Sequence, residues 1–87
     1  LDLVIIMKEL VDYIVKSLVD HPNQVEVVEV QGPALTIIEL SVAAEDMGRV
    51  IGKSGRIINS IRTLLQVPAA KQGKKVSLEL LEADDFG

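Results

Sequence analysis

Apolar residues recur along the chain with two periods, one typical of helices and one typical of strands. Between Leu3 and Val19 they keep the three-and-four spacing of an amphipathic helix, at Met7, Leu10, Val11, Ile14, Val15 and Leu18. Lys8, Asp12 and Lys16 follow one another four residues apart on its polar side. Asp20, His21 and Pro22 predict where the helix ends, because the residue before a proline is pushed out of the helical conformation.

Two strands are expected after this helix. The segment from Gln24 to Val30 alternates, but its phase slips by one residue at Val27 and Val28, which predicts a bulge. Leu35 to Val42 is rich in β-branched residues and places Ile38, Leu40 and Val42 on one face. Because only the turn Gln31 to Ala34 separates the two strands, we expect them to be antiparallel neighbours.

Helical spacing returns on both sides of a pair of glycines, Gly52 and Gly55. Before them, Ala44, Glu45 and Asp46 offer caps for a short helix through Val50, whose buried side is expected to hold Met47, Val50 and Ile51. After them, a longer helix is expected to press Ile57, Ile58, Ile61, Leu64 and Leu65 onto the sheet. Its other side then carries Arg56, Asn59, Arg62 and Thr63.

The C-terminal third is predicted from its helix breakers and its alternation. Pro68 lacks the N–H that a helix interior needs, so the helix should kink between Leu64 and Val67 or restart at the proline. Gly73 is the natural stop, and Val76 to Leu80 alternate as a third strand. An acidic tail from Glu82 to Gly87 is expected to be frayed.

The order helix, strand, strand, helix, turn, helix, strand predicts a two-layer α+β fold. We expect a three-stranded mixed sheet covered on one face by three helices. With 87 residues, the chain is expected to form a single domain over residues 1–87, in which residues 1–6 are an extension before a natural start at Met7 and residues 83–87 are the frayed end.

Composition excludes several classes of protein. The absence of cysteine rules out disulfides, thiolate metal sites and a thiol nucleophile. The longest apolar run, Leu3 to Met7, is far shorter than the roughly twenty residues of a membrane span. Asp2 is the only charged residue before Lys8, so the basic leader of a signal peptide is missing. We therefore expect a cytoplasmic protein without a membrane partner.

The charge of the chain is unevenly distributed. Seven of its nine basic residues lie between Gly48 and Lys75 with no acidic residue among them, so this segment carries +7 and the remainder −11, within a net charge of −4. A polyanion responds to the local field more than to net charge, which favours a nucleic-acid partner for this segment. The alternative is a solvated helix face, which is what charge runs usually form.

The basic segment surrounds the sequence Gly52-Lys53-Ser54-Gly55, the most informative stretch of the chain. Two glycines three residues apart can form a tight turn whose backbone lies open to a large ligand. A helix that starts at such a turn presents unpaired N–H groups and the positive end of its dipole. Lys53 and Arg56 add formal charge, so the sequence predicts an anion site that would suit a phosphate.

The stretch from Val50 to Ile61 resembles the signature of the KH domain, in which an isoleucine-glycine-x-x-glycine turn links two helices. The element order resembles the prokaryotic (type II) arrangement. More narrowly, Met7 to Glu82 is similar to the small single-domain bacterial KH proteins of the KhpA type. The flanking matches are Met7-Lys8-Glu9-Leu10-Val11, Leu18-Val19-Asp20-His21-Pro22 and Arg62-Thr63-Leu64-Leu65. Pro68 departs from the alanine-rich helix expected there.

This resemblance implies a non-enzymatic protein, without a cofactor, that binds single-stranded RNA as a global RNA-binding protein or RNA chaperone. A KH turn clamps the backbone of about four nucleotides while bases lie in an adjacent groove. On this chain, Gly52 and Gly55 would permit close approach, Lys53 and Ser54 would face phosphates, and Arg56 would lie at the helix start. Ile51 and Ile58 are groove candidates that core packing explains equally well; Arg49, Lys74 and Lys75 could extend the phosphate track. Only Tyr13 and Phe86 are aromatic, and both lie outside the basic segment, which disfavours RNA modules that rely on aromatic stacking.

Three alternatives remain. A nucleotide-binding P-loop nearly fits Gly48 to Ser54, but it needs four residues between its glycines where this chain has three. An enzyme could use His21 or a Glu45–Asp46 pair, although capping explains these residues more simply. The third alternative is a protein-interaction module with weak RNA affinity, working as a homodimer or, as the resemblance implies, as a heterodimer with a KhpB (Jag-type) KH protein.

Overall fold

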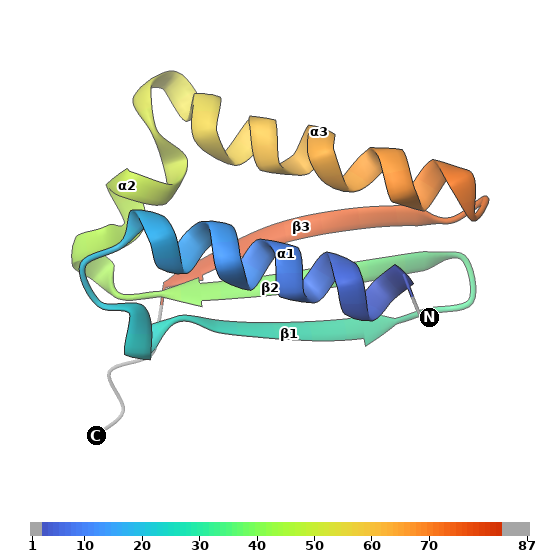
Figure 1. Cartoon of the computed structure of the whole chain (residues 1–87), viewed down its shortest axis with the longest axis horizontal. Coiled ribbons are helices and arrows are strands. Elements are labelled where there is room, and N and C mark those ends of the chain that lie inside the picture. The colour runs from blue at the N-terminus through green and yellow to red at the C-terminus, as the bar shows by residue number, and fades with distance from the viewer. Residues whose placement is uncertain (1–2, 83–87) are drawn as a thin grey trace.

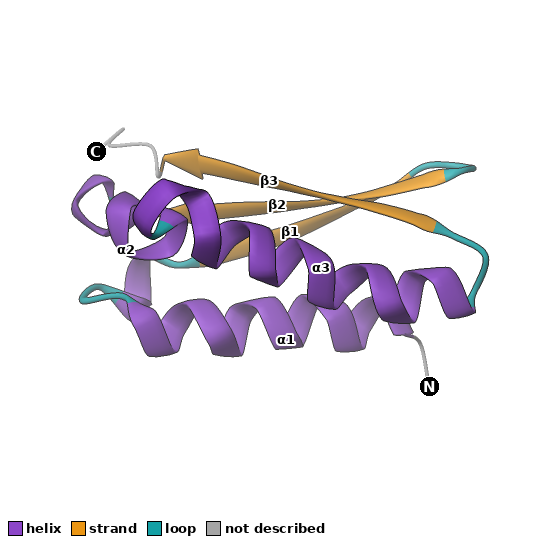
Figure 2. Ribbon diagram, turned by 90° about the horizontal axis from the view of Figure 1, so that it is seen from above, coloured by secondary structure: helices purple, strands orange, loops and turns teal. Residues whose placement is uncertain are grey.

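The computed structural model describes residues 3–82, with side chains from Met7 onward, as one sheet with helices packed on one face (Figure 1 and Figure 2). Its helices are α1 (Leu3–Leu18), α2 (Met47–Ile51) and α3 (Arg56–Lys71), and its strands are β1 (Glu26–Gln31), β2 (Leu35–Val42) and β3 (Lys75–Glu82). Three short 3-10 turns lie at Pro22–Gln24, Ala44–Asp46 and Lys53–Gly55. The predicted α+β class and element order are confirmed, as is the order of a type II KH domain.

The sheet is mixed, as expected, with strand order β1-β2-β3. β1 and β2 are antiparallel neighbours across the turn at Gly32, whose N–H donates to the carbonyl of Leu35 at 2.8 Å. β3 pairs in parallel with β2, which requires a crossover, and α2 with α3 supplies it. The predicted bulge is wrong, because pairing runs unbroken from Glu26 with Ser41 to Gln31 with Thr36.

The phase slip has a different cause. Val27 points into the core, whereas Val28 and Val30 are 41% and 46% exposed on the sheet face that carries no helix. Figure 2 shows this face open, with both long helices on the other side. Valine at these positions therefore satisfies the strand preference of the backbone rather than burial.

The core lies between the sheet and the helices. It is almost entirely aliphatic, and its buried members are Met7, Val11, Val15, Val27, Ile38, Leu40, Val42, Val50, Ile58, Ile61, Leu65, Ala69, Val76 and Leu78. The predicted inner face of β2 is confirmed, because Ile38, Leu40 and Val42 are completely buried. None of the helices that the structure describes is long and apolar enough to span a membrane.

Helix α3 differs from the expectation at two positions. Leu64 is 52% exposed and not pressed on the sheet, since Ile61 and Leu65 occupy the centre of the buried side. Pro68 neither interrupts nor restarts the helix, which continues to Lys71. The proline lies in the last turns of the helix, so it removes a single backbone bond, the one to the carbonyl of Leu64.

The end of α3 confirms Gly73 as the stop. Gly73 has a positive φ of 65°. Its N–H donates to the carbonyl of Ala70 at 3.0 Å, and the N–H of Lys74 donates to that of Ala69 at 3.0 Å. This pair of bonds is the Schellman arrangement. The third strand follows and is longer than predicted, reaching Glu82, while the rest of the expected acidic tail lies outside the described residues.

Candidate nucleic-acid interface

The two glycines lie in the connection from α2 to α3, at one end of the molecule (Figure 1). The short helix α2 ends at Ile51, the turn occupies Gly52 to Gly55, and α3 begins at Arg56. This connection projects away from the sheet in Figure 1, so its backbone is accessible from outside. The predicted helix-turn-helix order around the glycines is confirmed.

Gly52 is required by two independent constraints. Its φ of 74° and ψ of 178° fall in a region that essentially only glycine occupies. A Cβ at this position would also lie 2.5 Å from Cγ1 of Ile57. Ile57, at the start of α3, therefore packs directly over the Gly52 backbone and fixes the direction in which α3 leaves the turn.

The following residues complete a compact, left-handed turn. Ser54 has φ 57° and ψ 28°, and Gly55 has φ 75° and ψ 13°, so two consecutive residues are left-handed. The N–H of Gly55 donates to the carbonyl of Gly52 at 3.2 Å, which closes the turn. A Cβ on Gly55 would meet only Nδ2 of Asn59, at 3.6 Å. Conformation, rather than lack of space, is thus what favours glycine at position 55.

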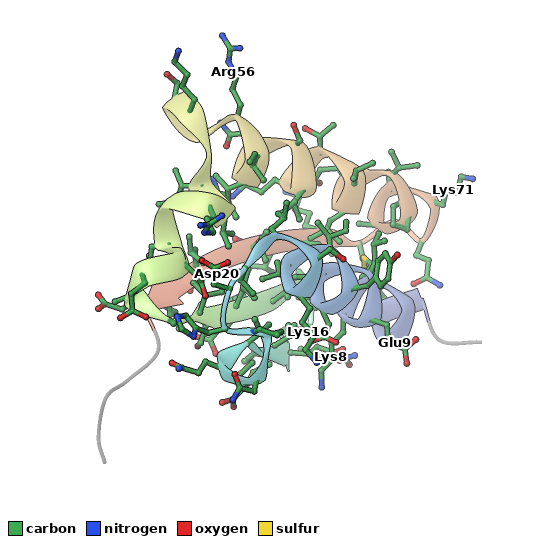
Figure 3. The ribbon with its side chains drawn as sticks, turned by 60° about the vertical axis from the view of Figure 1, so that its left-hand side comes forward. Lys8, Glu9, Lys16, Asp20, Arg56 and Lys71 are labelled. Atoms are coloured by element: carbon green, nitrogen blue, oxygen red, sulfur yellow. The ribbon has the colours of Figure 1, made fainter. Side chains whose placement is uncertain are left out.

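The turn presents donors and positive charge outward. Among the described residues, no side chain caps the turn at Gly52 or the start of α3 at Gly55. The side chains of Lys53, Ser54 and Arg56 are exposed, and that of Arg56 extends away from the body of the molecule (Figure 3). An anion at this place would meet the uncapped start of α3, the positive end of its dipole and two cationic side chains together.

Asp46 anchors this end of the molecule, a role that the sequence did not reveal. Its side chain is completely buried, and it does not cap α2 as expected. Its Oδ1 accepts the N–H of Asp20 and its Oδ2 accepts the N–H of His21, both at 3.0 Å. A carboxylate that precedes the site helix thus binds the chain just after α1, across more than twenty residues of sequence.

The pKa of Asp46 reflects this environment. Burial opposes ionisation, but the N–H groups of Asp20 and His21, together with the electrostatic influence of the His21 ring and of Arg49, outweigh it and lower the pKa below its ordinary value. The carboxylate is therefore ionised throughout the neutral range. Because it lies directly before α2, it orients the helix that leads into the glycine turn.

Arg49 lies on α2 but is directed toward the acidic end of α1. Its Nη2 is 3.0 Å from Oδ2 of Asp20, and its Nε is 3.8 Å from Oδ1 of Asp46. The same cluster includes His21, whose Nε2 lies 3.4 Å from Oε2 of Glu45. These carboxylates compensate part of the Arg49 charge, so the structure does not present Arg49 as freely as Lys53 and Arg56.

The remaining predicted residues lie in different surroundings. Ile51 is 36% exposed beside the turn, in contrast to its expected burial, whereas Ile58 is only 5% exposed and belongs to the core. Lys74 and Lys75 follow the far end of α3, which is sixteen residues or about 24 Å from the turn. Figure 3 shows this separation through Arg56 and Lys71, which lie at opposite ends of the helix.

The sequence placed Asn59 and Arg62 on the polar side of α3 but did not single out the stripe that they form with Gly55 and Gln66. Gly55, Asn59, Arg62 and Gln66 are spaced four, three and four residues apart, so they share one side of the helix. Arg62 contacts the carbonyl of Leu78 through Nε at 3.4 Å and Nη2 at 3.3 Å. Gln66 donates to the carbonyl of Val76 at 3.0 Å. The spacing was a usable signal, but the partner strand could not be identified without the fold.

One of the alternatives can be judged from this geometry. A P-loop places its glycine-rich loop between a strand and a helix, whereas Gly48 to Ile51 are themselves helical in α2. The P-loop interpretation is therefore wrong. Within the described residues, no group of three or more histidine and acidic side chains could hold a metal ion. In the cluster around Asp46, His21 pairs with Glu45 and Arg49 pairs with Asp20.

Known proteins resemble the chain over nearly its full length. A family model described as KhpA/KhpB, KH domain matches residues 8–80. A Chlamydia pneumoniae protein named RNA-binding protein KhpA is 53% identical over 76 residues, which cover 87% of this chain and 97% of that relative. A protein of the same name from Clostridium perfringens is 55% identical over 75 residues, 86% of this chain and 100% of the relative.

A more distant relative, again named RNA-binding protein KhpA, comes from Borreliella burgdorferi and is 47% identical over 74 residues, 85% of this chain and 90% of the relative. No solved structure matches the chain. The fold, the glycine turn and the family model agree with one another. The chain belongs to the KhpA/KhpB family of KH-domain proteins.

Proposed function

We propose that this protein binds single-stranded RNA, with the turn from Gly52 to Gly55 clamping the phosphate backbone. The observation that carries this proposal is the turn itself, in which Gly52, Ser54 and Gly55 have positive φ angles, the side chains of Lys53 and Ser54 are exposed, and no side chain caps the helix that follows. The names of the relatives support RNA as the polyanion. KH domains bind RNA through such a turn.

The geometry suits a phosphodiester for three reasons. Gly52 and Gly55 adopt the positive φ angles that the tight, accessible turn requires, at no steric cost. The uncapped start of α3 places the positive end of the helix dipole at the same point. Lys53 and Arg56 add two full charges, and neither forms an ion pair with another described residue.

A clamp on the backbone reads no base directly, which is compatible with a global RNA-binding protein or RNA chaperone of the cytoplasm. Contacts to phosphates fix the position of a nucleic acid without carrying sequence information. The protein would then act on many RNAs, and its base preference would have to come from residues beside the turn. No enzymatic step is part of this proposal.

The turn is tested by replacing Lys53 and Ser54 with aspartate in one variant. Both side chains are exposed, so the fold should persist while RNA affinity is lost by at least about tenfold through repulsion of the phosphates. The matched control is Lys8→Asp with Ser17→Asp on α1, which changes net charge by the same amount on exposed positions away from the turn. An RNA shift assay that shows equal losses in both variants would contradict the clamp.

A second copy of the chain or a KhpB-type KH protein is proposed as a partner, as the family name suggests. The observation in favour is a set of exposed apolar side chains on the two long helices. They are Leu10 and Tyr13 on α1, 36% and 73% exposed, and Leu64 and Val67 on α3, 52% and 57% exposed. Exposed apolar side chains that gather on neighbouring helices can mark a protein-interaction surface.

The pairing is tested by sedimentation of the wild type and of the Leu64→Glu, Val67→Glu variant. We expect a dimer that dissociates in the variant, because two charges would be buried without partners. Tyr13→Phe keeps the apolar area and serves as the control. A wild type that stays monomeric at about 100 μM, a concentration at which an affinity of about 6 kcal/mol would already show, would contradict self-association.

A further inference from the structure

The strand β1 forms the lower edge of the sheet in Figure 1, and β3 forms the other edge. In an antiparallel pair, alternate residues direct their N–H and C=O groups away from the partner strand, so alternate residues of β1 offer these groups at the edge. Proteins commonly protect such an edge with a proline, a lysine or a bulge. β1 contains no proline and no lysine, and its pairing with β2 is unbroken from Glu26 to Gln31. The edge is therefore regular enough to accept a further strand.

The side chains of β1 differ between the two faces of the sheet. Val28 and Val30 lie on the face that carries no helix and are 41% and 46% exposed. Glu29 alternates onto the other face, on which α1 packs (Figure 2). A strand added at this edge would place successive side chains on opposite faces in the same way. It would therefore meet exposed valines on one face and a carboxylate on the other.

A groove of about 750 Å³ lies between α1 and β1. The charged residues that line it are Lys8, Glu9, Asp12, Glu26 and Glu29. Asp12 is compensated by a lysine one turn further along α1, whose Nζ lies 3.1 Å from Oδ2 of Asp12. Glu9, Glu26 and Glu29 form no ion pair with another described residue. The groove therefore keeps three uncompensated carboxylates against one lysine.

This negative charge discriminates among the possible occupants of the edge. RNA would be repelled by the carboxylates of the groove. A second copy paired edge to edge would bring two acidic strands together, because β1 carries Glu26 and Glu29 and no basic residue. An extended basic segment would instead gain ion pairs in the groove in addition to the backbone hydrogen bonds of a new strand.

We propose that β1 is a docking edge for an extended segment of a partner protein, rich in lysine or arginine, which adds to the sheet as a fourth strand. Its basic side chains lie in the groove beside Glu9 and Glu29, and its alternate apolar side chains cover Val28 and Val30 on the open face. The glycine turn belongs to the connection between α2 and α3, so this segment and an RNA occupy different surfaces. The docking edge does not depend on the RNA clamp.

The experiment uses the full chain and three fluorescent peptides of eight residues. The first alternates lysine and valine, the second has the same sequence with every backbone nitrogen methylated, and the third alternates glutamate and valine. Methylation removes the N–H donors of a strand and keeps the charge. Affinities are measured by anisotropy for the wild type, for Glu9→Lys with Glu29→Lys, and for Glu79→Lys with Glu82→Lys. This last variant is the matched control, because it makes the same change of charge on β3, at the other edge of the sheet.

We expect the wild type to bind the lysine–valine peptide at least about tenfold more tightly than either of the other peptides, because only the first supplies both strand donors and positive charge. Glu9→Lys with Glu29→Lys should weaken this binding by about tenfold, and the control variant by about twofold or less. Equal affinities for the methylated and unmethylated peptides, or equal losses in the two variants, would show general attraction to an acidic chain and overturn the proposal. The comparison of peptides uses the wild type alone, so it holds whether or not the variants fold.

The place of binding is read from the backbone amides of isotope-labelled protein by NMR. The lysine–valine peptide should shift the amides from Glu26 to Gln31 most and leave those from Gly52 to Gly55 unchanged. Shifts confined to α3 or β3 would overturn the proposal. Shifts along β1 that appear when the protein alone is concentrated, or when single-stranded RNA is added, would assign the edge to a second copy or to RNA and would equally overturn it.

Discussion

The position of Gly52 imposes two constraints that only glycine satisfies. Its backbone lies at φ 74° and ψ 178°, and the side chain of Ile57 fills the space where a Cβ would be. Gly48, four residues earlier, has the opposite character, because it is an exposed helical glycine with nothing within 4 Å of its missing Cβ. The two positions form a natural pair for an experiment.

Replacing Gly52 with alanine should lower the free energy of unfolding by about 2–4 kcal/mol, through backbone strain and overlap with Ile57. Gly48→Ala should instead raise it by about 0.5–1 kcal/mol, because alanine is the better helix former. Urea unfolding followed by circular dichroism measures both. Equal effects of the two substitutions would mean that the turn does not have the described conformation.

The buried carboxylate of Asp46 makes stability depend on acid. The pKa of this carboxylate is lower in the folded protein than in the unfolded chain. Its contribution to stability is therefore complete above the pKa of an unfolded aspartate, about 3.9. This contribution is lost as the pH falls through the lower pKa of the folded state. Asp46→Asn should melt several degrees lower at neutral pH, because its amide nitrogen would face a backbone N–H. It should also lose less stability than the wild type below about pH 4. Parallel pH profiles of melting temperature would refute this role.

At the scale of elements, α3 determines the geometry of the site. Its Ile57 packs against Gly52 of the turn. The helix buries Ile58, Ile61 and Leu65 in the core and places the polar stripe along β3. The helix tolerates Pro68 near its end, where the carbonyl of Leu64 loses its donor. This tolerance suggests that packing, rather than a complete set of backbone bonds, maintains the helix.

Substituting Pro68 with alanine should therefore stabilise the protein by about 1–2 kcal/mol, since the regained backbone bond exceeds the loss of chain stiffness in the unfolded state. RNA affinity should not change, because the substitution lies twelve residues, more than three helical turns, beyond Arg56 at the glycine turn. Chemical denaturation and the shift assay test the two statements. Destabilisation would mean that the proline is matched to a bend in the helix.

The sequence was sufficient for features that depend on local pattern. The apolar spacing of α1, the alternation of β2 and the glycine pair each correspond to the observed elements within a few residues. Features that depend on tertiary partners were not predictable. From the sequence Asp46 was expected to cap a helix, whereas the structure shows it bound to the backbone that follows α1. Leu64 has the spacing of a core residue but is exposed. The hydrogen bond from Arg62 to the carbonyl of Leu78 could not be predicted, because the sequence does not show that β3 lies beside α3.

At the scale of the whole molecule, the basic side chains of the segment from Gly48 to Lys75 are spread out rather than clustered. Lys53 and Arg56 lie at the turn, whereas Lys71, Lys74 and Lys75 lie near the other end of α3 (Figure 3). Arg49 is turned toward Asp20. A short RNA held at the turn would meet few of the seven basic residues of this segment. Only a strand that follows the polar stripe along the helix would approach Lys74 and Lys75.

The salt dependence of binding reports how many phosphates are neutralised. For a single strand of about four nucleotides, log affinity should fall against log salt with a slope of about 2–3, since each phosphate contributes about 0.7. Lys53→Ala should reduce the slope by about 0.7, and the Lys8→Ala control should leave it unchanged. Anisotropy titrations over a range of salt concentrations provide the slopes. A flat response would favour a protein-interaction role over RNA binding.

The central claim, that RNA lies on the glycine turn, is tested most directly by titrating isotope-labelled protein with a short single-stranded RNA and following its backbone amides by NMR. The largest shifts should occur at the amides from Gly52 to Arg56, with smaller ones continuing to Asn59 and Arg62. The open sheet face should remain unchanged. Unshifted amides in the turn, with shifts gathered on α1 or on the open face around Val28 and Val30, would contradict the account.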